Sequence, residues 1–377
     1  MKKRLKICFV SLHSFYNPGG VKNHILFLKK EFEKRGHIVK IAIPRRSITE
    51  KYKDKNIKLL GTSFPFPFNG SQGDLTFCFN QRSIVNFFKK EKFDILHFHN
   101  FGIHSWQILE KSNTKINVLT FHSYIDLKIN KFFKTFPFVL DLLKKIVNKK
   151  ISGIIGIAPF NLKIFNDFRG KKVVIPNGID LEKFNPNVPK IKKFLDGKIN
   201  ILFVGRIEER KGLIYLLKAY KILKKNYKNI RLIIVGKGNL KKNCENWVKE
   251  NRLKDVIFEG KIEEERIPFY FSSCDIFVAP AIYGESFGIV LLEAMASGKP
   301  VVGFGIPAYK AVLKGKGEEF LVKPKDWRSL AKKMEILIKD EEKRKEMGEW
   351  GKEKAQEYSW DIIANKVLSF YQKLMEG

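Results

Sequence analysis

Two glutamates and a glycine-bounded loop occur together in one short stretch of the sequence, residues 284–299. The loop reads Gly-Glu-Ser-Phe-Gly, and it precedes an apolar run at residues 289–296 whose only polar member is Glu293. A loop that opens a helix presents free backbone N–H groups, which form a ready site for an anion. With Glu285 and Glu293 nearby, the pattern indicates a phosphate-bearing ligand that also carries hydroxyl groups. An ordinary α/β loop with a solvated glutamate explains the same residues about equally well.

Basic residues and glycines follow two other apolar runs. Arg206 and Lys211 lie in the loop after residue 204, where a basic pair would hold a diphosphate, or they are two solvated charges in a lysine-rich chain. Gly19 and Gly20 end the loop after the first apolar run and would let the backbone approach a ligand closely. A tight turn is an equally supported alternative for this glycine pair.

Two histidines end successive apolar runs in the first half of the chain. His99 ends the run at residues 93–99, and His122 follows the run at residues 117–121. Ligands of open α/β sheets bind outside the carboxyl ends of the strands. His99, His122 and Asp126 are therefore candidates for a pocket, with a structural role for the histidines as the alternative.

The elements that must position these residues repeat along the chain. Apolar runs with strand character lie at residues 6–10, 37–43, 93–99, 117–121, 152–157, 172–175, 199–204, 231–235, 256–259, 276–279 and 300–303. Helical patterns are clearest at residues 21–35, 82–92, 131–150, 213–225 and 360–374. Residues 62–74 are rich in proline, glycine and phenylalanine, and this composition predicts a long functional loop.

The strand–loop–helix pattern starts again after residue 198, which predicts two doubly wound α/β halves in tandem, with parallel strands and right-handed crossovers. A polar, proline-containing stretch after residue 176 marks the boundary between them. The last helix has one apolar face and is expected to pack back across the fold. The predicted domains are residues 1–176, residues 177–358 and a final helix at residues 359–377.

Charge and composition limit the classes of partner. Lysine and arginine number 72 against 39 acidic residues, a net charge of +33 that attracts anionic surfaces. No recognised nucleic-acid module occurs, so nucleic acid is not an expected partner. Four scattered cysteines favour a reducing compartment over a disulfide frame or zinc site. With no signal peptide or spanning segment recognised, a soluble or peripheral protein is expected.

Two basic helical patterns bear on membrane contact. Residues 82–92 and 131–150 combine phenylalanines or other apolar side chains with flanking lysines. Such helices suit the surface of an anionic membrane. A core helix with a solvated basic face is the commoner origin of this pattern.

These motifs together resemble the retaining GT-B glycosyltransferases, a large family that includes phosphatidylinositol mannosyltransferases and sucrose synthases. The resemblance covers nearly the whole chain and is carried by the motifs NPGG, TFH, PNGID, VGRIEERKG, VGKG and GESFGIVLLEAMASGKPVV. The mannosyltransferase type is the most similar pattern, through FNGS, the basic helix near Arg82, FDILHFH and TFHS. The resemblance implies two Rossmann-like domains that face a cleft, with the C-terminal helix crossing back to the N-terminal domain.

The resemblance also implies a role for individual residues. The residues with implied catalytic roles are Arg206, Lys211, Glu285 and His122. The residues implied to bind the donor are Gly19, Gly20, Ile262, Ser286, Phe287, Gly288, Ile289 and Glu293. The residues implied to bind the acceptor are Asn69, Arg82, His122 and Asp126. The family needs no metal and no cofactor, since the nucleotide-sugar is a substrate.

The expected activity is transfer of a hexose, with retention, from a GDP-mannose-like or UDP-sugar donor to a lipid or lipid-linked glycan acceptor. The expected location is cytoplasmic, on the inner face of the cell membrane. Three alternatives remain open from the sequence. They are a sugar-nucleotide epimerase of the same fold, a soluble glycosyltransferase with a non-lipid acceptor, and a basic protein that only binds anionic lipid.

Overall fold

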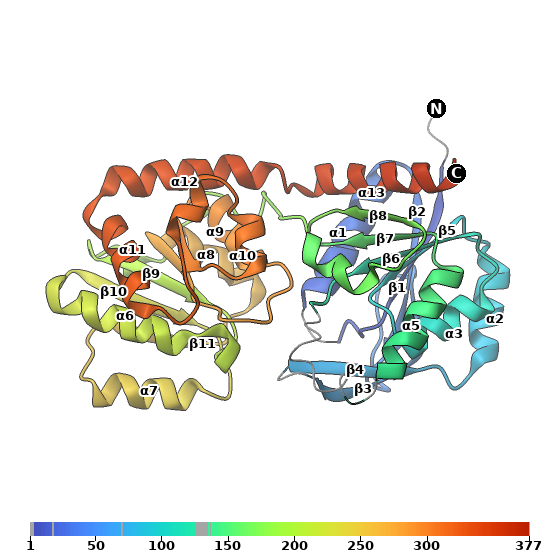
Figure 1. Cartoon of the computed structure of the whole chain (residues 1–377), viewed down its shortest axis with the longest axis horizontal. Helices are drawn as coiled ribbons and strands as arrows, with labels where there is room; N and C mark the ends of the chain where they lie inside the picture. The colour runs from blue at the N-terminus through green and yellow to red at the C-terminus, as the bar shows by residue number, and fades with distance from the viewer. Residues whose placement is uncertain (1–3, 17–18, 69–70, 125–134, 136, 377) are drawn as a thin grey trace. The chain divides into compact units, whose positions relative to one another are not determined.

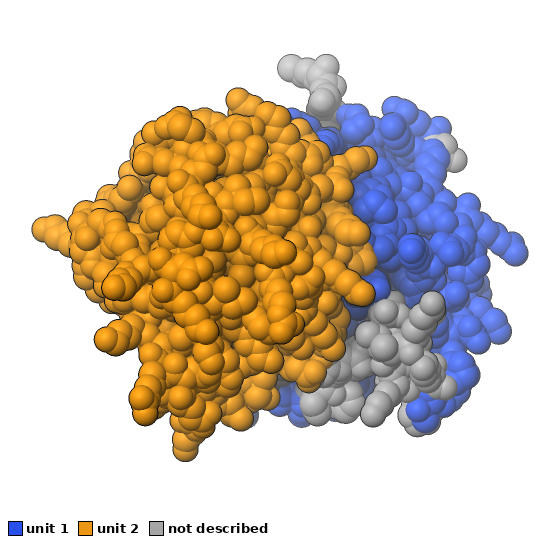
Figure 2. Space-filling view, turned by 60° about the vertical axis from the view of Figure 1, so that its left-hand side comes forward, with its two compact units in different colours: residues 1–177, 360–377 blue, residues 178–359 orange. Residues whose placement is uncertain are grey.

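The computed structural model describes residues 4–16, 19–68, 71–124, 135 and 137–376, without the side chains of residues 66–68 and 71–73. The chain divides into two compact units (Figure 2). Unit 1 contains Met1–Asn177 and Trp360–Gly377, and unit 2 contains Gly178–Ser359. None of the helices in the described part of the chain combines the length and the apolar character needed to span a membrane.

A mixed sheet forms the centre of unit 1, with strand order β4-β3-β2-β1-β5-β6-β7-β8. The strands are β1 Lys6–Ser11, β2 Ile38–Arg45, β3 Ile57–Phe68, β4 Ser71–Phe77, β5 Ile95–His99, β6 Ile116–Phe121, β7 Gly153–Gly156 and β8 Lys171–Val174. Neighbouring strands are parallel except for the β3–β4 pair. The helices of this unit are α1 Gly20–Lys34, α2 Gln81–Glu91, α3 Ile103–Lys111, α5 Pro137–Lys150 and α13 Trp360–Met375.

The described part of the predicted loop at residues 62–74 is strand. Residues 62–68 and 71–74 belong to an antiparallel pair, β3 with β4, whose register runs from Thr62 opposite Phe77 to Phe68 opposite Ser71. The pairing of β3 with β2 ends at Thr62, so the later part of β3, which contains two prolines, has one described neighbour strand. Proline lacks an N–H group and is tolerated on such an edge. The prolines of this segment therefore mark an edge strand and not a loop.

The two faces of the unit 1 sheet are both buried, as expected for parallel strands covered by helices. Successive residues of β1 point to opposite faces. Ile7 and Phe9 pack with α1 and α13, whereas Cys8 and Val10 pack with α2, α3 and α5 (Figure 1). This alternation explains why strand runs of this chain are apolar throughout instead of alternating with polar residues.

Helix α13 joins unit 1 although it follows unit 2 in the sequence. Its Trp360 ring stacks on Phe27 of α1, with ring centroids 5.2 Å apart. Its Tyr371 hydroxyl lies 2.5 Å from Nδ1 of His97, a buried histidine of β5. The other ring nitrogen of His97 lies 2.6 Å from the Thr120 hydroxyl of β6, so both nitrogens have partners. The helix is thus held by packing and by one buried polar contact.

We expect Tyr371→Phe to lower the free energy of unfolding by about 1–3 kcal/mol, because it leaves a buried nitrogen of His97 without a partner. Urea unfolding at pH 7 measures the change. Tyr16→Phe is the matched control, since the Tyr16 side chain is exposed and its hydroxyl group faces water. Equal losses for the two variants would contradict this role of the hydroxyl group.

Unit 2 contains a second sheet, which is parallel throughout, with strand order β11-β10-β9-β12-β13-β14. Its strands are β9 Ile199–Val204, β10 Ile230–Val235, β11 Val256–Gly260, β12 Ile276–Ala279, β13 Val301–Phe304 and β14 Leu321–Val322. Its helices are α6 Leu213–Asn226, α7 Lys241–Glu250, α8 Ile267–Ser273, α9 Ile289–Ala296, α10 Pro307–Val312, α11 Trp327–Lys339 and α12 Glu341–Gln356. The two sheets confirm the predicted α/β fold with two Rossmann-like halves, and they place a topological switch point at β9.

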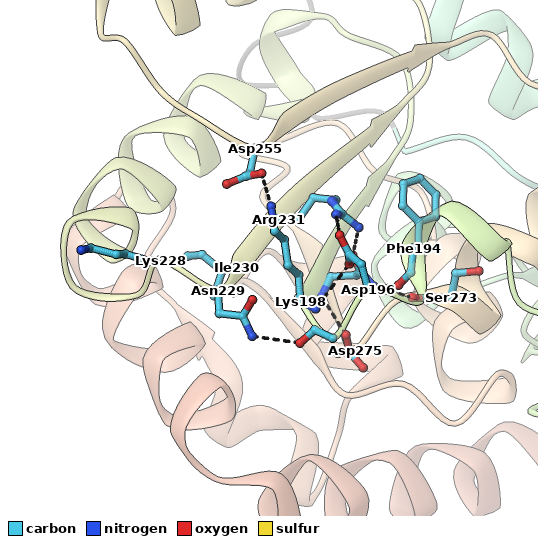
Figure 3. A network of polar contacts seen from close by, with 12 residues as sticks. Phe194, Asp196, Lys198, Lys228, Asn229, Ile230, Arg231, Asp255, Ser273 and Asp275 are labelled. Atoms are coloured by element: carbon cyan, nitrogen blue, oxygen red, sulfur yellow. Dashed lines mark hydrogen bonds and ion pairs between the residues drawn. The ribbon is translucent and has the colours of Figure 1, made fainter.

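A polar network ties the strands of unit 2 together at their amino ends (Figure 3). Arg231 of β10 is 6% exposed and forms an ion pair with Asp196. Its guanidinium group also donates to Asn200 Oδ1 at 3.2 Å and lies over the Phe194 ring. The Asn200 N–H group donates to Asp275 Oδ2 at 2.7 Å, next to β12. These contacts satisfy a buried charge and align three strands at the amino edge of the sheet.

Candidate active site

The loops at the carboxyl edge of the unit 2 sheet pack against one another through glycine. Gly212 has a φ of +66°, and a Cβ atom there would lie 2.0 Å from the Pro280 carbonyl oxygen. A Cβ atom on Gly236 would lie 1.8 Å from the Gly205 carbonyl oxygen. Only glycine allows such close approach. The loops after β9, β10 and β12 are therefore held in fixed positions relative to one another.

A charged cluster lies where these loops meet. Lys211 Nζ lies 2.6 Å from Glu285 Oε1, and Arg210 Nη1 lies 2.9 Å from the same oxygen. The Glu285 side chain is 10% exposed. Both ion pairs use Oε1, and no contact is found for Oε2 within the described part of the chain. The second oxygen of Glu285 is therefore available to a ligand.

Arg206 adds a more exposed charge to this cluster. Its guanidinium group lies 3.3 Å from Glu208 Oε1, which also contacts Arg210 Nε at 2.5 Å. The Arg206 side chain is 50% exposed, against 13% for Arg210. Three cations and two carboxylates leave the cluster with a net charge of 3 − 2 = +1. The exposed part of that charge is on Arg206, where an anion would meet it.

The electrostatics of the cluster keep Glu285 ionised. Burial alone would raise the pKa of its carboxyl group, but the nearby charges of Lys211 and Arg210 hold the pKa below its ordinary value. A carboxylate in this state accepts hydrogen bonds and donates none. Glu285 is thus suited to hydroxyl groups of a sugar and also fixes the ammonium group of Lys211.

The loop after Glu285 leads into α9. Gly288 precedes the helix with a φ of +94°, and no side chain caps this helix end. The first N–H groups of a helix have no intrahelical acceptor, and the helix dipole is positive at this end. The loop residues Ser286, Phe287, Gly288 and Ile289 therefore present backbone donors next to the charged cluster.

Glu293 lies on α9, one turn further from the loop. Burial raises the pKa of its carboxyl group to about 7, and the charge of Lys183 opposes this rise without cancelling it. No hydrogen bond or ion pair to this carboxyl group is found in the part of the chain that the structure describes. A partly buried acid without a partner is a candidate ligand contact. Ile262 lies after β11 and is also partly buried at this edge of the sheet.

In unit 1, the structure brings His122 together with two other buried histidines. His122 Nε2 lies 3.0 Å from Nδ1 of His99, at the ends of β6 and β5. The His24 ring of α1 packs edge-on against His122, with centroids 4.7 Å apart. Burial lowers the pKa of all three histidines, that of His24 to about 4, so each is neutral at pH 7. The His122 N–H group donates to Asn100 Oδ1 at 2.8 Å, which fixes its backbone.

Ring nitrogens of His24, His99 and His122 lie within 4.8 Å of one another, and neutral imidazoles are common metal ligands. Two of these nitrogens are in mutual hydrogen-bonding distance, and His24 Nδ1 lies 2.9 Å from Asn177 Oδ1. As arranged, these rings bond to each other and to an amide. The arrangement holds the His122 ring in a defined orientation.

The other sequence-predicted residues are placed as follows. Gly19 precedes α1 and Gly20 begins it, and a Cβ atom at either would have no neighbour within 4 Å. Arg82 is exposed on the first turn of α2. Asn69 and Asp126 lie outside the described residues. The glycine pair is therefore not required by crowding within the described structure.

Sequence reasoning missed Arg210 and His24. Arg210 is adjacent to Lys211 in a loop of several charges, and composition offers no way to separate paired from solvated charges there. His24 could have been predicted from its position. It lies beside Ile25 on the buried face of α1, where a polar residue needs a partner. Both gaps have the same origin: the partner of each residue lies far away in the sequence.

Comparisons with known proteins agree with this geometry. The model of the glycosyl transferases group 1 family matches residues 185–354, and the model of glycosyltransferase family 4 matches residues 18–183. The chain therefore belongs to the GT-B glycosyltransferases.

The chain is also similar to individual proteins, in sequence or in structure. A phosphatidyl-myo-inositol mannosyltransferase of Mycobacterium leprae is 29% identical over 98% of this chain and 96% of its own length. Sucrose-phosphate synthase from Thermosynechococcus elongatus superimposes with a TM-score of 0.75 at 20% identity, over 99% of this chain and 100% of its own. Anabaena HepE in complex with UDP superimposes with a TM-score of 0.77 at 17% identity, over 98% of this chain and 100% of its own.

We expect Glu285→Gln to lower the free energy of unfolding by about 3 kcal/mol at pH 7, since it removes the carboxylate partner of Lys211 and leaves Arg210 with Glu208 alone. Because the pKa of Glu285 is lower when folded, its stabilisation is present above about pH 4.5 and is lost as pH falls further. Urea unfolding between pH 3.5 and 7 measures this. The exposed Glu263→Gln is the control, and a pH-independent difference would contradict the ion pairs.

Glu293→Gln has the opposite pH signature. The folded pKa of Glu293, about 7, lies above its ordinary value of 4.5. The stability that the protonated acid contributes is complete below pH 4.5 and is lost as pH rises to 7. The variant should therefore gain stability relative to the wild type by roughly 2 kcal/mol between pH 4.5 and 8. Thermal unfolding at both pH values tests this, and a constant difference would show an exposed, ordinary carboxyl group.

Proposed function

We propose that this protein transfers a hexose, with retention of configuration, from a nucleotide diphosphate sugar to a lipid or lipid-linked glycan. We place the reaction at the cytoplasmic face of the membrane. The observation that carries the proposal is the Lys211–Glu285–Arg210 cluster, with Arg206 exposed beside it, at the opening of α9. It combines a surplus of positive charge, the N-terminal end of a helix that no side chain caps, and an ionised carboxylate.

The cluster supports the donor half of this reaction. The bond between sugar C1 and the diphosphate oxygen would break while the oxygen of the acceptor hydroxyl bonds to C1 on the same face. The nucleotide diphosphate would leave and take the proton of that hydroxyl. Negative charge develops on the departing oxygen as the sugar becomes cationic, and Arg206, Lys211 and the helix end at α9 would stabilise that charge, which is usually the largest catalytic term. The chain's own cations supply this stabilisation, so we propose a reaction that needs no metal and no cofactor besides the donor substrate.

Two carboxyl groups would orient the donor. Glu285 keeps Oε2 available for sugar hydroxyls, because both ion pairs occupy Oε1. Glu293 would accept hydrogen bonds from the ribose hydroxyls, which would give its unpartnered carboxyl group polar neighbours. Ile262 would line the base pocket. Holding the donor by several groups at once reduces the entropy lost on the way to the transition state.

Similarity to known proteins and the net charge of the chain support the acceptor half of the proposed reaction. The relative from Mycobacterium leprae is by name a phosphatidyl-myo-inositol mannosyltransferase, and the similarity extends over nearly the whole chain. The net charge of +33 favours an anionic lipid surface. Arg82, on the first turn of α2, would contact the acceptor headgroup. His122 would lie beside the reacting hydroxyl, as a neutral ring whose orientation His99 maintains.

A transfer assay tests the proposal. Labelled GDP-mannose or UDP-glucose is incubated with the protein and vesicles that contain phosphatidylinositol, and glycolipid product is measured. We expect product, and we expect Lys211→Gln to lower kcat by about 10²- to 10³-fold, as for loss of one oxyanion donor. Lys314→Gln, at an exposed position after α10, is the control and should leave kcat unchanged.

Three outcomes would contradict the proposal. Release of an epimerised donor without any acceptor would identify an epimerase, and transfer only to soluble acceptors would exclude the lipid. Vesicle binding that persists in Lys211→Gln and Glu285→Ala, without transfer by the wild type, would indicate a lipid-binding protein.

A further inference from the structure

Unit 2 has a hollow at the opposite edge of its sheet from the candidate active site. A cavity of about 430 Å³ lies between the C-terminal end of α6 and the loop that precedes β11. The six-residue strand β10 separates the two edges, and a strand of that length spans about 20 Å. The hollow is therefore a separate feature from the donor site, and nothing in the proposed reaction uses it.

The lining of this hollow is strongly basic. Its six cations are Lys221, Lys224, Lys225, Lys228, Arg252 and Lys254, and the one acid is Asp255. The formal charge of the lining is therefore 6 − 1 = +5. Asp255 is already paired with Lys224 at 2.7 Å. It also pairs with Lys198 (Figure 3), so it does not neutralise the other cations.

Five of the six cations have no counter-charge among the described residues. Lys224 is held by Asp255, and Lys221 donates to Asn251 at 2.7 Å. Lys225, Lys228, Arg252 and Lys254 are exposed, and no ion pair to them is found among the described residues. Like charges gathered around one hollow repel each other and attract a polyvalent anion.

Two helix dipoles compensate part of the positive charge around the hollow. The C-terminal ends of α6 and α7 lie near the hollow, and each carries about half a negative charge from its helix dipole. Lys224 also donates to the carbonyl groups of Lys228 and Ile230, which lie beyond the end of α6. Two helix ends supply roughly −1 in total, which leaves most of the +5 uncompensated.

We propose that this hollow, the α6–β11 pocket, binds a phosphate-bearing ligand independently of the donor site. Its volume lies within the range of small-molecule sites. Lysine ammonium groups bind phosphate as point charges, and several of them suit a ligand with more than one phosphate charge. The lining has no aromatic side chain on which a base could stack, which disfavours single-stranded nucleic acid as the occupant.

Lysine footprinting with tripolyphosphate as the probe tests the pocket itself. The full-length protein is acetylated with and without the probe, and modification of each lysine is measured by mass spectrometry. We expect slower modification of Lys225, Lys228 and Lys254, and unchanged rates at the exposed Lys242, Lys314 and Lys332. This residue-level readout separates the pocket from any binding at Lys211. Equal protection of both groups, or of neither, would overturn the proposal.

A charge-matched pair of variants gives a second measurement. One variant carries Lys225→Gln, Lys228→Gln and Lys254→Gln, and the control carries Lys242→Gln, Lys314→Gln and Lys332→Gln. Calorimetric titration with tripolyphosphate should show the pocket variant weakened about tenfold or more, with the control unchanged. Equal weakening of both would show a general charge effect and overturn the proposal. Transfer activity of the pocket variant should be retained, which separates this test from that of the proposed function.

Vesicle binding distinguishes the two sources of such a ligand. Vesicles of phosphatidylglycerol with phosphatidylcholine are compared with phosphatidylcholine alone for both triple variants. Selective loss of binding by the pocket variant would support the pocket and assign it to a lipid headgroup. Unchanged vesicle binding, together with lost tripolyphosphate binding, would support the pocket and assign it to a free phosphate.

Discussion

The ion pairs of Glu285 with Lys211 and Arg210 are the interaction on which the candidate site depends. They join two loops that lie about 75 residues apart in the sequence and that follow different strands. A buried carboxylate is stable only with such partners. The carboxylate in turn holds Lys211, and together with Glu208 it holds Arg210. The cluster therefore fixes the position of the ammonium group and keeps the acid ionised.

In unit 1, a group of buried polar side chains is held by hydrogen bonds and not by ion pairs. His24, His97, His99 and His122 are buried and neutral. They obtain their partners from one another, from Thr120, from Asn177 and from Tyr371 of the returning helix α13. Because each ring nitrogen that is bonded restricts its ring, the network can orient His122 at the end of β6. These histidines are thus held by hydrogen bonds between neutral groups, whereas the cluster in unit 2 is held by ion pairs.

Much of the fold could be predicted from periodicity. The bounds of β9, β12 and α9 agree with the apolar runs, because both faces of a buried element are apolar and the limits are set by glycine and proline. The pair β3–β4 was mispredicted for the same reason, since its prolines and glycines are the residues that normally mark a loop. Pairing at a sheet edge removes the need for their N–H groups, and this depends on a neighbour strand that local composition does not reveal.

The sequence by itself determined the α/β class. It also determined which residues are capable of the predicted chemistry, namely the glycine-bounded loop before α9 and the positions Arg206, Lys211, Glu285 and Glu293. Residue type, charge and spacing are local properties, so they can be identified from the sequence alone. Tertiary structure alone decided that Arg210 shares Glu285 with Lys211, that Glu293 has a raised pKa, and that lysines from α6 and the loop before β11 surround one hollow. Burial and electrostatic fields depend on distances between groups far apart in the chain, and only folding establishes those distances.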